Sequence, residues 1–164
     1  MNIITISREF GSGGRELGKR LADLLEYDYY DREIIASVAE KNGMDAAYVE
    51  NTLNNHGWKN QVITFRGTLG GASYVQSSKV ALLLEQKKVI EQIAELGRNC
   101  IIVGRNADVI LREYKPFNIF VCASRDSKLT RCLERASEGE ILTEKELLRK
   151  MKRIDEVRSQ TREI

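Results

Sequence analysis

Residues 3–18 read IITISREFGSGGRELG, and the order of elements in this stretch sets the architecture expected for the whole chain. The β-branched run Ile3–Ile6 predicts a buried strand. A glycine-rich turn, Gly11–Gly14, follows, and from Leu17 onward leucines recur at helical spacing. A strand, a glycine turn and a helix in this order point backbone N–H groups at an anion. The stretch therefore predicts a phosphate-binding turn, where glycine leaves room for the close approach of a phosphate.

The turn departs from the standard P-loop pattern, G-x-x-x-x-G-K-[ST], in which a lysine contacts the phosphates and a hydroxyl binds Mg²⁺. With Gly14 as the second glycine, Arg15 stands at the lysine position and Glu16 at the hydroxyl position. Glu9 then stands at the first glycine position. A tight turn that binds no ligand is the alternative interpretation. Four basic residues near the turn favour an anion site: Arg8, Arg15, Lys19 and Arg20.

The composition is that of an ordinary soluble globular domain. The chain has 164 residues, of which 42% are hydrophobic and 30% charged, so one domain with a sizeable core is expected. Its net charge of +2 is too small to indicate nucleic-acid binding. No apolar run has the length of a membrane span, and the first strand begins without a preceding signal peptide. A cytoplasmic protein with no membrane contact is therefore expected.

The cysteines and the single histidine, His56, do not form a metal-binding pattern. Cys100, Cys122 and Cys132 are odd in number, and the first two lie in apolar runs, so they are interpreted as buried, reduced thiols. Since no Cys-x-x-Cys pair occurs, no metal held by protein side chains alone is expected.

Alternating strands and helices in the rest of the chain predict an α/β fold with a parallel sheet flanked by helices. Residues Tyr27–Asp31 are either a short strand ending in a carboxylate or a contact between helices. The expected helices are Arg32–Lys41, Asp45–Leu53 and Val80–Leu96, and the expected buried strands are Cys100–Val103 and Phe117–Ala123. Ligands bind at the carboxyl ends of parallel strands. Four segments at these ends should therefore converge on one cleft: Ser7–Arg15, Asp31, Gly104–Asp108 and Ser124–Asp126.

The sequence allows two roles for each of two regions. Residues 54–79 contain several glycines that break regular structure. Their large side chains suit either a grip on a base and a phosphate or a local mini-core: Trp58, Phe65, Arg66 and Tyr74. The C-terminal third is basic, and a capping box over Thr143–Glu146 predicts the start of its last helix. Its arginines form either a solvated face or the mobile cations that phosphoryl transfer needs: Arg131, Arg135, Arg153 and Arg158.

Four motifs together resemble the cytidylate kinase-like proteins, which are P-loop nucleoside monophosphate kinases. They are SREFGSGGR at 7–15, the aromatic segment ending in Asp31, GRNAD at 104–108 and RIDEVR at 153–158. The resemblance covers essentially the whole chain. It implies transfer of the ATP γ-phosphate to CMP or dCMP with Mg²⁺. It also implies a single kinase domain over residues 1–164, with a nucleoside monophosphate (NMP)-binding insert at about 44–79 and a helical lid at about 131–160.

The resemblance also implies roles for individual residues. The phosphates of ATP would be held by Gly11, Ser12, Gly13, Gly14, Arg15 and Glu16. The acceptor would be bound by Asp31, Arg66, Arg105 and Asp108, with Arg105 on its phosphate and Asp108 on its cytosine or sugar. The catalytic cations would be Arg15, Arg131, Arg153 and Arg158, which Asp155 helps to hold.

The sequence departs from the family pattern at three places. Arg15 replaces the lysine, Glu16 replaces the hydroxyl, and the chain ends at Ile164, before the family's last strand and helix. Loss of that strand would leave an apolar edge on Phe117–Ala123. A non-catalytic nucleotide-binding module and a kinase for another small phosphate acceptor are the alternative functions. The expected partners are small nucleotides, and the expected state is a monomer or homodimer.

Overall fold

The computed structural model describes residues 1–47, 49–50, 71–135 and 143–160. Strands and helices alternate along it, as the sequence predicts. The elements are β1 Ile3–Arg8, α1 Gly14–Leu25, β2 Asp28–Tyr30, α2 Arg32–Lys41, α4 Gly71–Glu95, β3 Cys100–Val103, α5 Ala107–Ile110, the 3-10 helix Arg112–Tyr114, β4 Phe117–Val121, α6 Arg125–Glu134 and α7 Glu144–Gln160.

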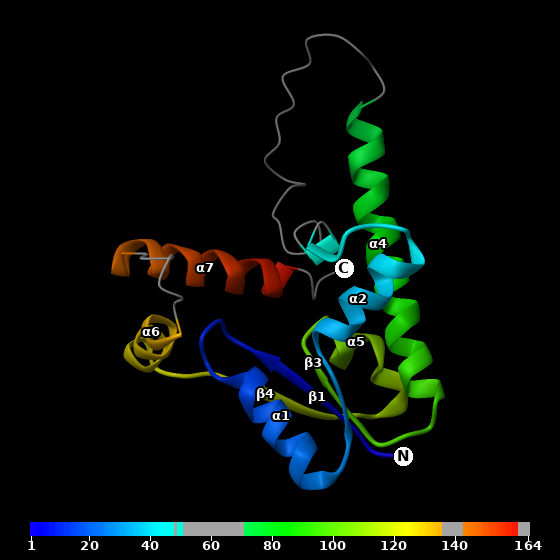
Figure 1. The fold of residues 1–164 in the computed structure, drawn as a ribbon, viewed down its shortest axis with the longest axis horizontal. Coiled ribbons are helices and arrows are strands. Elements are labelled where there is room, and N and C mark those ends of the chain that lie inside the picture. Colours follow the sequence, from blue (N-terminus) through cyan, green and yellow to red (C-terminus); the bar gives the residue numbers. More distant parts are fainter. Residues whose placement is uncertain (48, 51–70, 136–142, 161–164) are drawn as a thin grey trace.

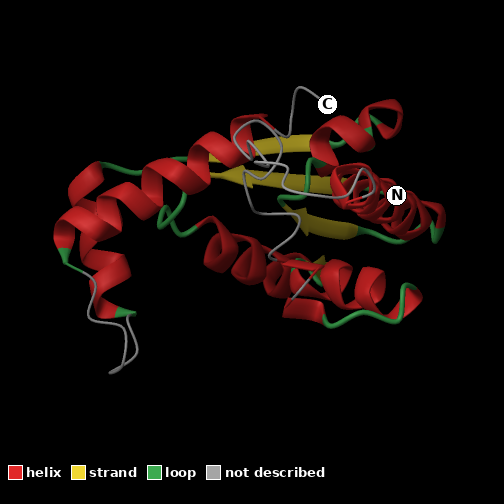
Figure 2. Cartoon of the chain, turned by 90° about the horizontal axis from the view of Figure 1, so that it is seen from above, coloured by secondary structure: helices red, strands yellow, loops and turns green. Residues whose placement is uncertain are grey.

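The four strands form one parallel sheet in the order β2-β3-β1-β4, and Figure 2 shows them side by side. In the central strand β1, Thr5 lies opposite Ile102 of β3 and Asn118 of β4. Of the two interpretations of Tyr27–Asp31, the short strand is confirmed: it is β2, and it ends directly before Asp31. Since all four strands run the same way, their carboxyl ends share one edge of the sheet.

Two hydrophobic cores cover the two faces of the sheet. On one face, Ile102 packs with α2, α4 and α5, and on the other Ile101 and Val103 pack with α1. Gly18 allows the close approach of α1, because a Cβ there would lie 2.8 Å from Val103 Cγ2. A third core joins α6 and α7, which Figure 1 shows beside the carboxyl end of β1. These two helices therefore lie next to the glycine turn.

Three expectations about the elements are wrong. The helix that was expected over Val80–Leu96 already includes Gly71, the first described residue of this element. A single glycine costs a helix only about 1 kcal/mol, so it does not by itself prevent a helix from forming. The strand over Phe117–Ala123 ends at Val121 and is largely exposed, because among the described strands only β1 pairs with it. Cys122, which follows it, is exposed.

Other expectations fall outside the described residues or receive partial support. The segment 51–70, which contains Arg66 and most of the proposed insert, lies outside the described residues. The helix expected over Asp45–Leu53 lies partly outside them. The capping box is confirmed, since Glu146 N donates to Thr143 Oγ1 at 3.3 Å and Thr143 N donates to Glu146 Oε2 at 2.9 Å. In the part of the chain that the structure describes, no helix is both long and apolar enough to span a membrane.

Candidate functional site

The glycine turn leaves the start of α1 open to a ligand. Gly11 and Gly13 have φ angles of +75° and +88°, which side chains rarely adopt. Gly13 is the N-cap of α1 and supplies no side-chain acceptor for the first helical N–H groups. Ser12 does not cap them either, because its hydroxyl donates to Glu9 O at 2.9 Å. A helix N-terminus of this kind offers N–H groups and a partial positive charge to an anion.

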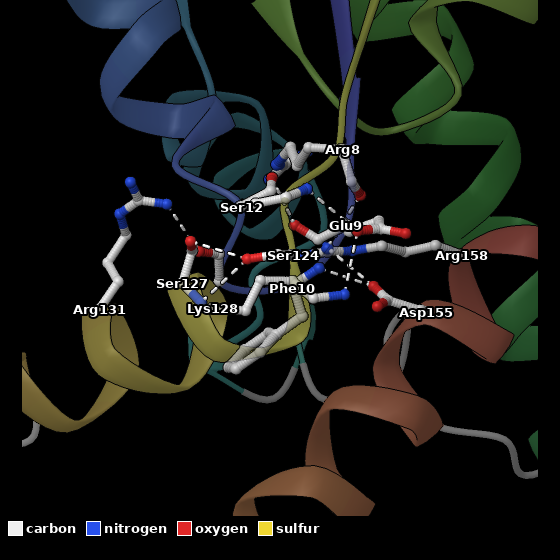
Figure 3. Close-up of polar contacts among 12 residues, drawn as sticks. Arg8, Glu9, Phe10, Ser12, Ser124, Ser127, Lys128, Arg131, Asp155 and Arg158 are labelled. Atoms are coloured by element: carbon white, nitrogen blue, oxygen red, sulfur yellow. Dashed lines mark hydrogen bonds and ion pairs between the residues drawn. The ribbon is translucent and has the colours of Figure 1, made fainter.

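Helix α6 holds the turn from one side, as Figure 3 shows. Lys128 Nζ lies 3.0 Å from Glu9 Oε2, and this hydrogen bond is the main reason that the pKa of Glu9 is lowered. Arg131 Nη1 donates to Gly11 O at 3.1 Å. Gly13 lies under the same arginine, since a Cβ there would approach Arg131 Nη1 to 3.1 Å. Side chains of α6 therefore contact the turn along much of its length.

Helix α7 holds the turn from the other side. Phe10 N donates to Asp155 Oδ1 at 2.7 Å, and Arg158 Nη1 donates to Arg8 O at 3.1 Å. Arg158 also pairs with Asp155 at 3.5 Å. We call the contacts of Lys128, Arg131 and Asp155 with residues 9–11 the loop clasp. The clasp ties the turn to the two C-terminal helices.

Beside the turn, a nearly buried arginine and a half-exposed one contact Asp31, whose side chain is 3% exposed. Arg15 Nε forms an ion pair with Asp31 Oδ2, and Arg15 Nη2 donates to Asp31 Oδ1 at 3.4 Å. Arg8 Nη2 lies 3.5 Å from the same Oδ1, so two arginines share one carboxylate. Arg105, whose side chain is 10% exposed, pairs with Glu50 at 3.6 Å.

The pKa values of three arginines at this place are lowered by burial and by neighbouring positive charges. Burial lowers the pKa of Arg8 to about 10, and the charge of Arg158 is the second cause. Burial also lowers the pKa of Arg105 and of Arg158, and each of them is further lowered by neighbouring arginines. We call Arg8, Arg15, Arg105 and Arg158 the arginine cluster. An anion placed among them would relieve this repulsion.

All four arginines of the cluster line one cavity of about 330 Å³ at the carboxyl ends of β1 and β3. The remaining lining residues come from the strand ends, the segment after α2, α4 and α7: Ser7, Glu9, Glu50, Leu83, Gln86, Gly104, Asn106, Phe120, Asp155, Val157 and Ser159. A second hollow, of about 590 Å³, lies on the outer side of α1 and has charges of both signs. Arg15 lines both spaces and so stands between them. The smaller cavity adjoins the glycine turn and is the candidate active site.

Comparison with known proteins identifies the family. The model of the cytidylate kinase-like family matches residues 3–163, which is nearly the entire chain. The chain belongs to the cytidylate kinase-like family. No curated protein matches this cytidylate kinase-like chain.

Solved structures share the fold of this cytidylate kinase-like chain. An uncharacterized protein from Eubacterium ventriosum is 25% identical, with a TM-score of 0.66 over 99% of this chain and 76% of that one. A shikimate kinase from Bacteroides thetaiotaomicron is 15% identical, with a TM-score of 0.59 over 97% of this chain and 80% of that one. A shikimate kinase from Acinetobacter baumannii, solved with shikimate, is 12% identical, with a TM-score of 0.52 over 96% of this chain and 74% of that one. The fold is thus P-loop NTPase-like, and the family and fold are those of P-loop kinases.

The structure brings together several residues that the sequence singled out. Arg15 and Asp31 are in contact, and Arg105 and Arg158 line the cavity with Arg15. Asp108 lies at its edge, where Ser7 Oγ donates to Asp108 Oδ1 at 3.4 Å. The predicted convergence of β1, β2 and β3 ends on one place is therefore confirmed.

Other candidates lie elsewhere. Arg153 is exposed on α7 and does not line the cavity. Glu16 pairs with Arg20 and Arg135 on the outer side of α1. The expectation that Ser124–Asp126 joins the cleft is wrong, because Ser124 instead caps α6, its Oγ accepting from Ser127 N at 3.3 Å. A residue that starts a helix turns its side chain toward that helix's own N–H groups.

Sequence reasoning noticed Arg8 as a nearby cation but gave it no role in the site. It also missed Gln86 of α4, which is buried and donates from Nε2 to Arg105 O at 3.3 Å. A buried glutamine on a helix surrounded by apolar positions was the available signal for this contact. Arg8 offered a comparable signal, because a charged residue at the end of a central strand faces the ligand edge of the sheet.

Proposed function

We propose that this protein transfers the γ-phosphate of ATP to a nucleoside monophosphate such as CMP or dCMP. The observation that carries the proposal is the arginine cluster, since four buried or half-buried guanidinium groups line a cavity next to an uncapped helix N-terminus. Phosphoryl transfer between two nucleotides brings several phosphate groups into one place. Such a site needs preorganised cations around the charge of the transition state.

ATP fits the glycine turn. Its phosphates would lie against the backbone N–H groups of Gly11–Gly14 and the start of α1, where side chains are excluded by the positive φ of Gly11 and Gly13. Mg²⁺ would arrive with the nucleotide and neutralise phosphate charge. Ser7 offers a hydroxyl oxygen near the end of β1, and Mg²⁺ usually keeps water and phosphate oxygens as its other ligands. Glu16 pairs with two arginines on the outer side of α1, so we do not assign it to Mg²⁺ in this proposal.

The acceptor fits the side of the cavity away from the turn. Arg105 would hold its phosphate in a bidentate contact, the geometry that suits arginine best. Asp108 would contact its cytosine or sugar, and Asp31 would keep Arg15 oriented. Transfer forms a bond from an acceptor phosphate oxygen to the γ-phosphorus and breaks the bond to the β,γ-bridging oxygen, which leaves with ADP. Residues 44–79 would enclose the acceptor, and residues 131–160 would bring Arg131, Arg153 and Arg158 toward the phosphates.

A coupled ADP-release assay tests this function directly. We expect Mg²⁺-dependent turnover with CMP or dCMP, measured beside UMP, AMP, GMP and shikimate at equal concentration. Turnover with shikimate and none with any monophosphate would show that the protein is a kinase for another small acceptor. Binding of ATP without turnover on any of these acceptors would support the alternative that the protein is a non-catalytic nucleotide-binding module.

The Arg105→Met variant tests the assignment of the acceptor side. We expect kcat/KM for the preferred monophosphate to fall roughly a hundredfold, because one well-placed cation is lost. The KM for ATP should change little. Arg112→Met is the matched control, since this arginine is exposed on the 3-10 helix after α5. An equal loss in both variants would contradict the assignment.

A further inference from the structure

Because α1 begins at Gly14, the turn can be aligned with the standard P-loop pattern in a second way. In that pattern the lysine directly follows the second glycine. Here α1 begins at Gly14, and Gly13 is its N-cap. With Gly13 as the second glycine, Gly14 stands at the lysine position and Arg8 stands at the first glycine position. In this register the chain has a glycine in place of the lysine and an arginine in place of a glycine.

The geometry shows that these two changes depend on each other. A Cβ on Gly14 would lie 2.7 Å from Arg8 Cβ, which is closer than side chains approach in folded proteins, and a tight 3.2 Å from Arg8 Cγ. The stem of Arg8 therefore occupies the space that a side chain at position 14 would need. A lysine at position 14 and an arginine at position 8 are mutually exclusive in this backbone.

A second glycine makes room for the charged end of Arg8. A Cβ on Gly104, at the carboxyl end of β3, would fall directly on Arg8 Nη1. Gly104 has a φ of +76°, so it also fits a turn that favours glycine. The Arg8 side chain thus runs from Gly14 to Gly104 along the cavity beside the turn. The side chain, which starts at the end of β1, thus directs its guanidinium group toward the space between the turn and Asp31.

The charge of Arg8 is suited to an incoming phosphate. Its side chain is 11% exposed, and its contact with Asp31 is long, 3.5 Å, because Arg15 holds the same carboxylate more closely. Burial and the charge of Arg158 lower the pKa of Arg8 to about 10, so Arg8 is still a cation at neutral pH. A buried cation with a weak, shared partner gains more from a phosphate than a fully paired one does.

We propose that Arg8 replaces the P-loop lysine and contacts the β- and γ-phosphates of ATP, while Arg15 acts with Asp31 on the acceptor side. The inference rests on the proposed function. Arginine presents a planar fork that matches two phosphate oxygens, so it can bridge the phosphates between which the bond breaks. Arg15, whose guanidinium is turned to Asp31, is then a residue for the acceptor and not the lysine substitute that its sequence position suggests.

The test compares Arg8→Met with Arg15→Met by calorimetric titration of Mg-ATP and by turnover. We expect Arg8→Met to weaken Mg-ATP binding roughly tenfold or more and to lower kcat about a hundredfold. Arg15→Met should raise the KM of the monophosphate and leave Mg-ATP binding within about threefold of the parent. Arg112→Met is again the matched control.

A double variant repeats the test if Arg8→Met does not fold. Arg8→Gly with Gly14→Lys removes the arginine and restores the standard residues. Val121 Cβ, which would lie 3.3 Å from a Cβ at position 14, needs to shift only slightly. We expect this double variant to bind Mg-ATP nearly as the parent does, whereas Gly14→Lys alone should be destabilised by the clash with Arg8.

Three results would contradict the proposals, and they are distinguishable. Mg-ATP binding in a folded Arg8→Met variant equal to that of the parent overturns the role of Arg8 alone. A larger loss of Mg-ATP affinity in Arg15→Met than in Arg8→Met does the same. A parent protein that binds no Mg-ATP contradicts the proposed function and, with it, this inference.

Discussion

The loop clasp and the arginine cluster lie on two sides of one turn, and they use charge in opposite ways. In the clasp each charged side chain has an acceptor or donor of its own, as Lys128 has Glu9 and Asp155 has Phe10 N. In the cluster Arg8 and Arg15 share Asp31, and neighbouring arginines lower one another's pKa. Paired charges hold a backbone in place, whereas crowded, buried cations are poised for an anion. We therefore propose that the clasp shapes the turn and that the cluster binds phosphate.

The largest effect is expected from Asp31→Ala. Removing this carboxylate leaves Arg8 and Arg15 without the partner they share, and breaking a buried ion pair in this way costs roughly 3 kcal/mol of unfolding free energy. Urea unfolding at pH 7 measures the loss. Asp23→Ala, an exposed change on α1, is the control and should be close to the parent.

An anion should partly reverse the Asp31→Ala defect. Because the cluster lacks negative charge in this variant, sulfate or phosphate should raise its unfolding midpoint more than that of the parent. An equal effect of sulfate on the variant and on the parent would show that the cluster does not bind the anion.

The next effect is expected in the clasp, from Asp155→Ala. This change removes the acceptor of the 2.7 Å hydrogen bond from Phe10 N and the partner of Arg158. A hydrogen bond to a charged group contributes about 2 kcal/mol, so the unfolding free energy should fall by that amount. Glu156→Ala, next along α7, is the control. Sulfate should restore less of this loss than it restores in Asp31→Ala, because it can compensate the charge of Arg158 but does not replace the acceptor of Phe10 N. Equal rescue in the two variants would contradict the comparison.

A smaller effect, dependent on pH, is expected from Lys128→Met. The hydrogen bond from Lys128 lowers the pKa of Glu9 below its ordinary value of 4.5, so the contribution of this pair to stability is present above that pH. It is lost as the pH falls through the lowered value, when the folded protein takes up the proton. Lys128→Met should therefore cost about 1 kcal/mol at pH 7, and in urea unfolding parent and variant should converge once the pH lies below the lowered pKa of Glu9. A constant difference across this range would contradict the pairing.

The smallest effect is expected from Arg135→Met. Arg135 pairs with Glu16 on the exposed outer side of α1, where solvent screens the charges. The unfolding midpoint and the binding of Mg-ATP should both match those of the parent. A clear loss of Mg-ATP affinity would show that Glu16 and its partner belong to the nucleotide site.

The sequence predicted the features that depend on neighbouring residues and on topology. The β-branched run Ile3–Ile6 and the glycines after it indicated β1, the turn and α1. The parallel order of strands then placed Asp31 and Arg105 at one edge. What it could not predict depends on contacts across the fold. The alignment with the P-loop pattern depends on α1 beginning at Gly14. The path of the Arg8 side chain depends on the space that Gly104 leaves open.

The exposure of β4 could not be derived from its composition either. Its apolar residues predict a buried strand, but Phe117 and Phe120 are 69% and 60% exposed, because burial depends on what lies beside the strand. Whether a second copy of the chain pairs with it remains a prediction, and sedimentation at high concentration measures it.

The most direct test of the account is a crystal structure with a bisubstrate analogue, adenosine and cytidine joined by a polyphosphate chain. The central claim is that the cluster, and not the outer hollow of α1, receives the phosphates. We expect the chain of phosphates to run from the N–H groups of Gly11–Gly14 past Arg8 to Arg105. Phosphates bound instead beside Lys19 and Arg32 in the outer hollow, with the cluster unchanged, would contradict it.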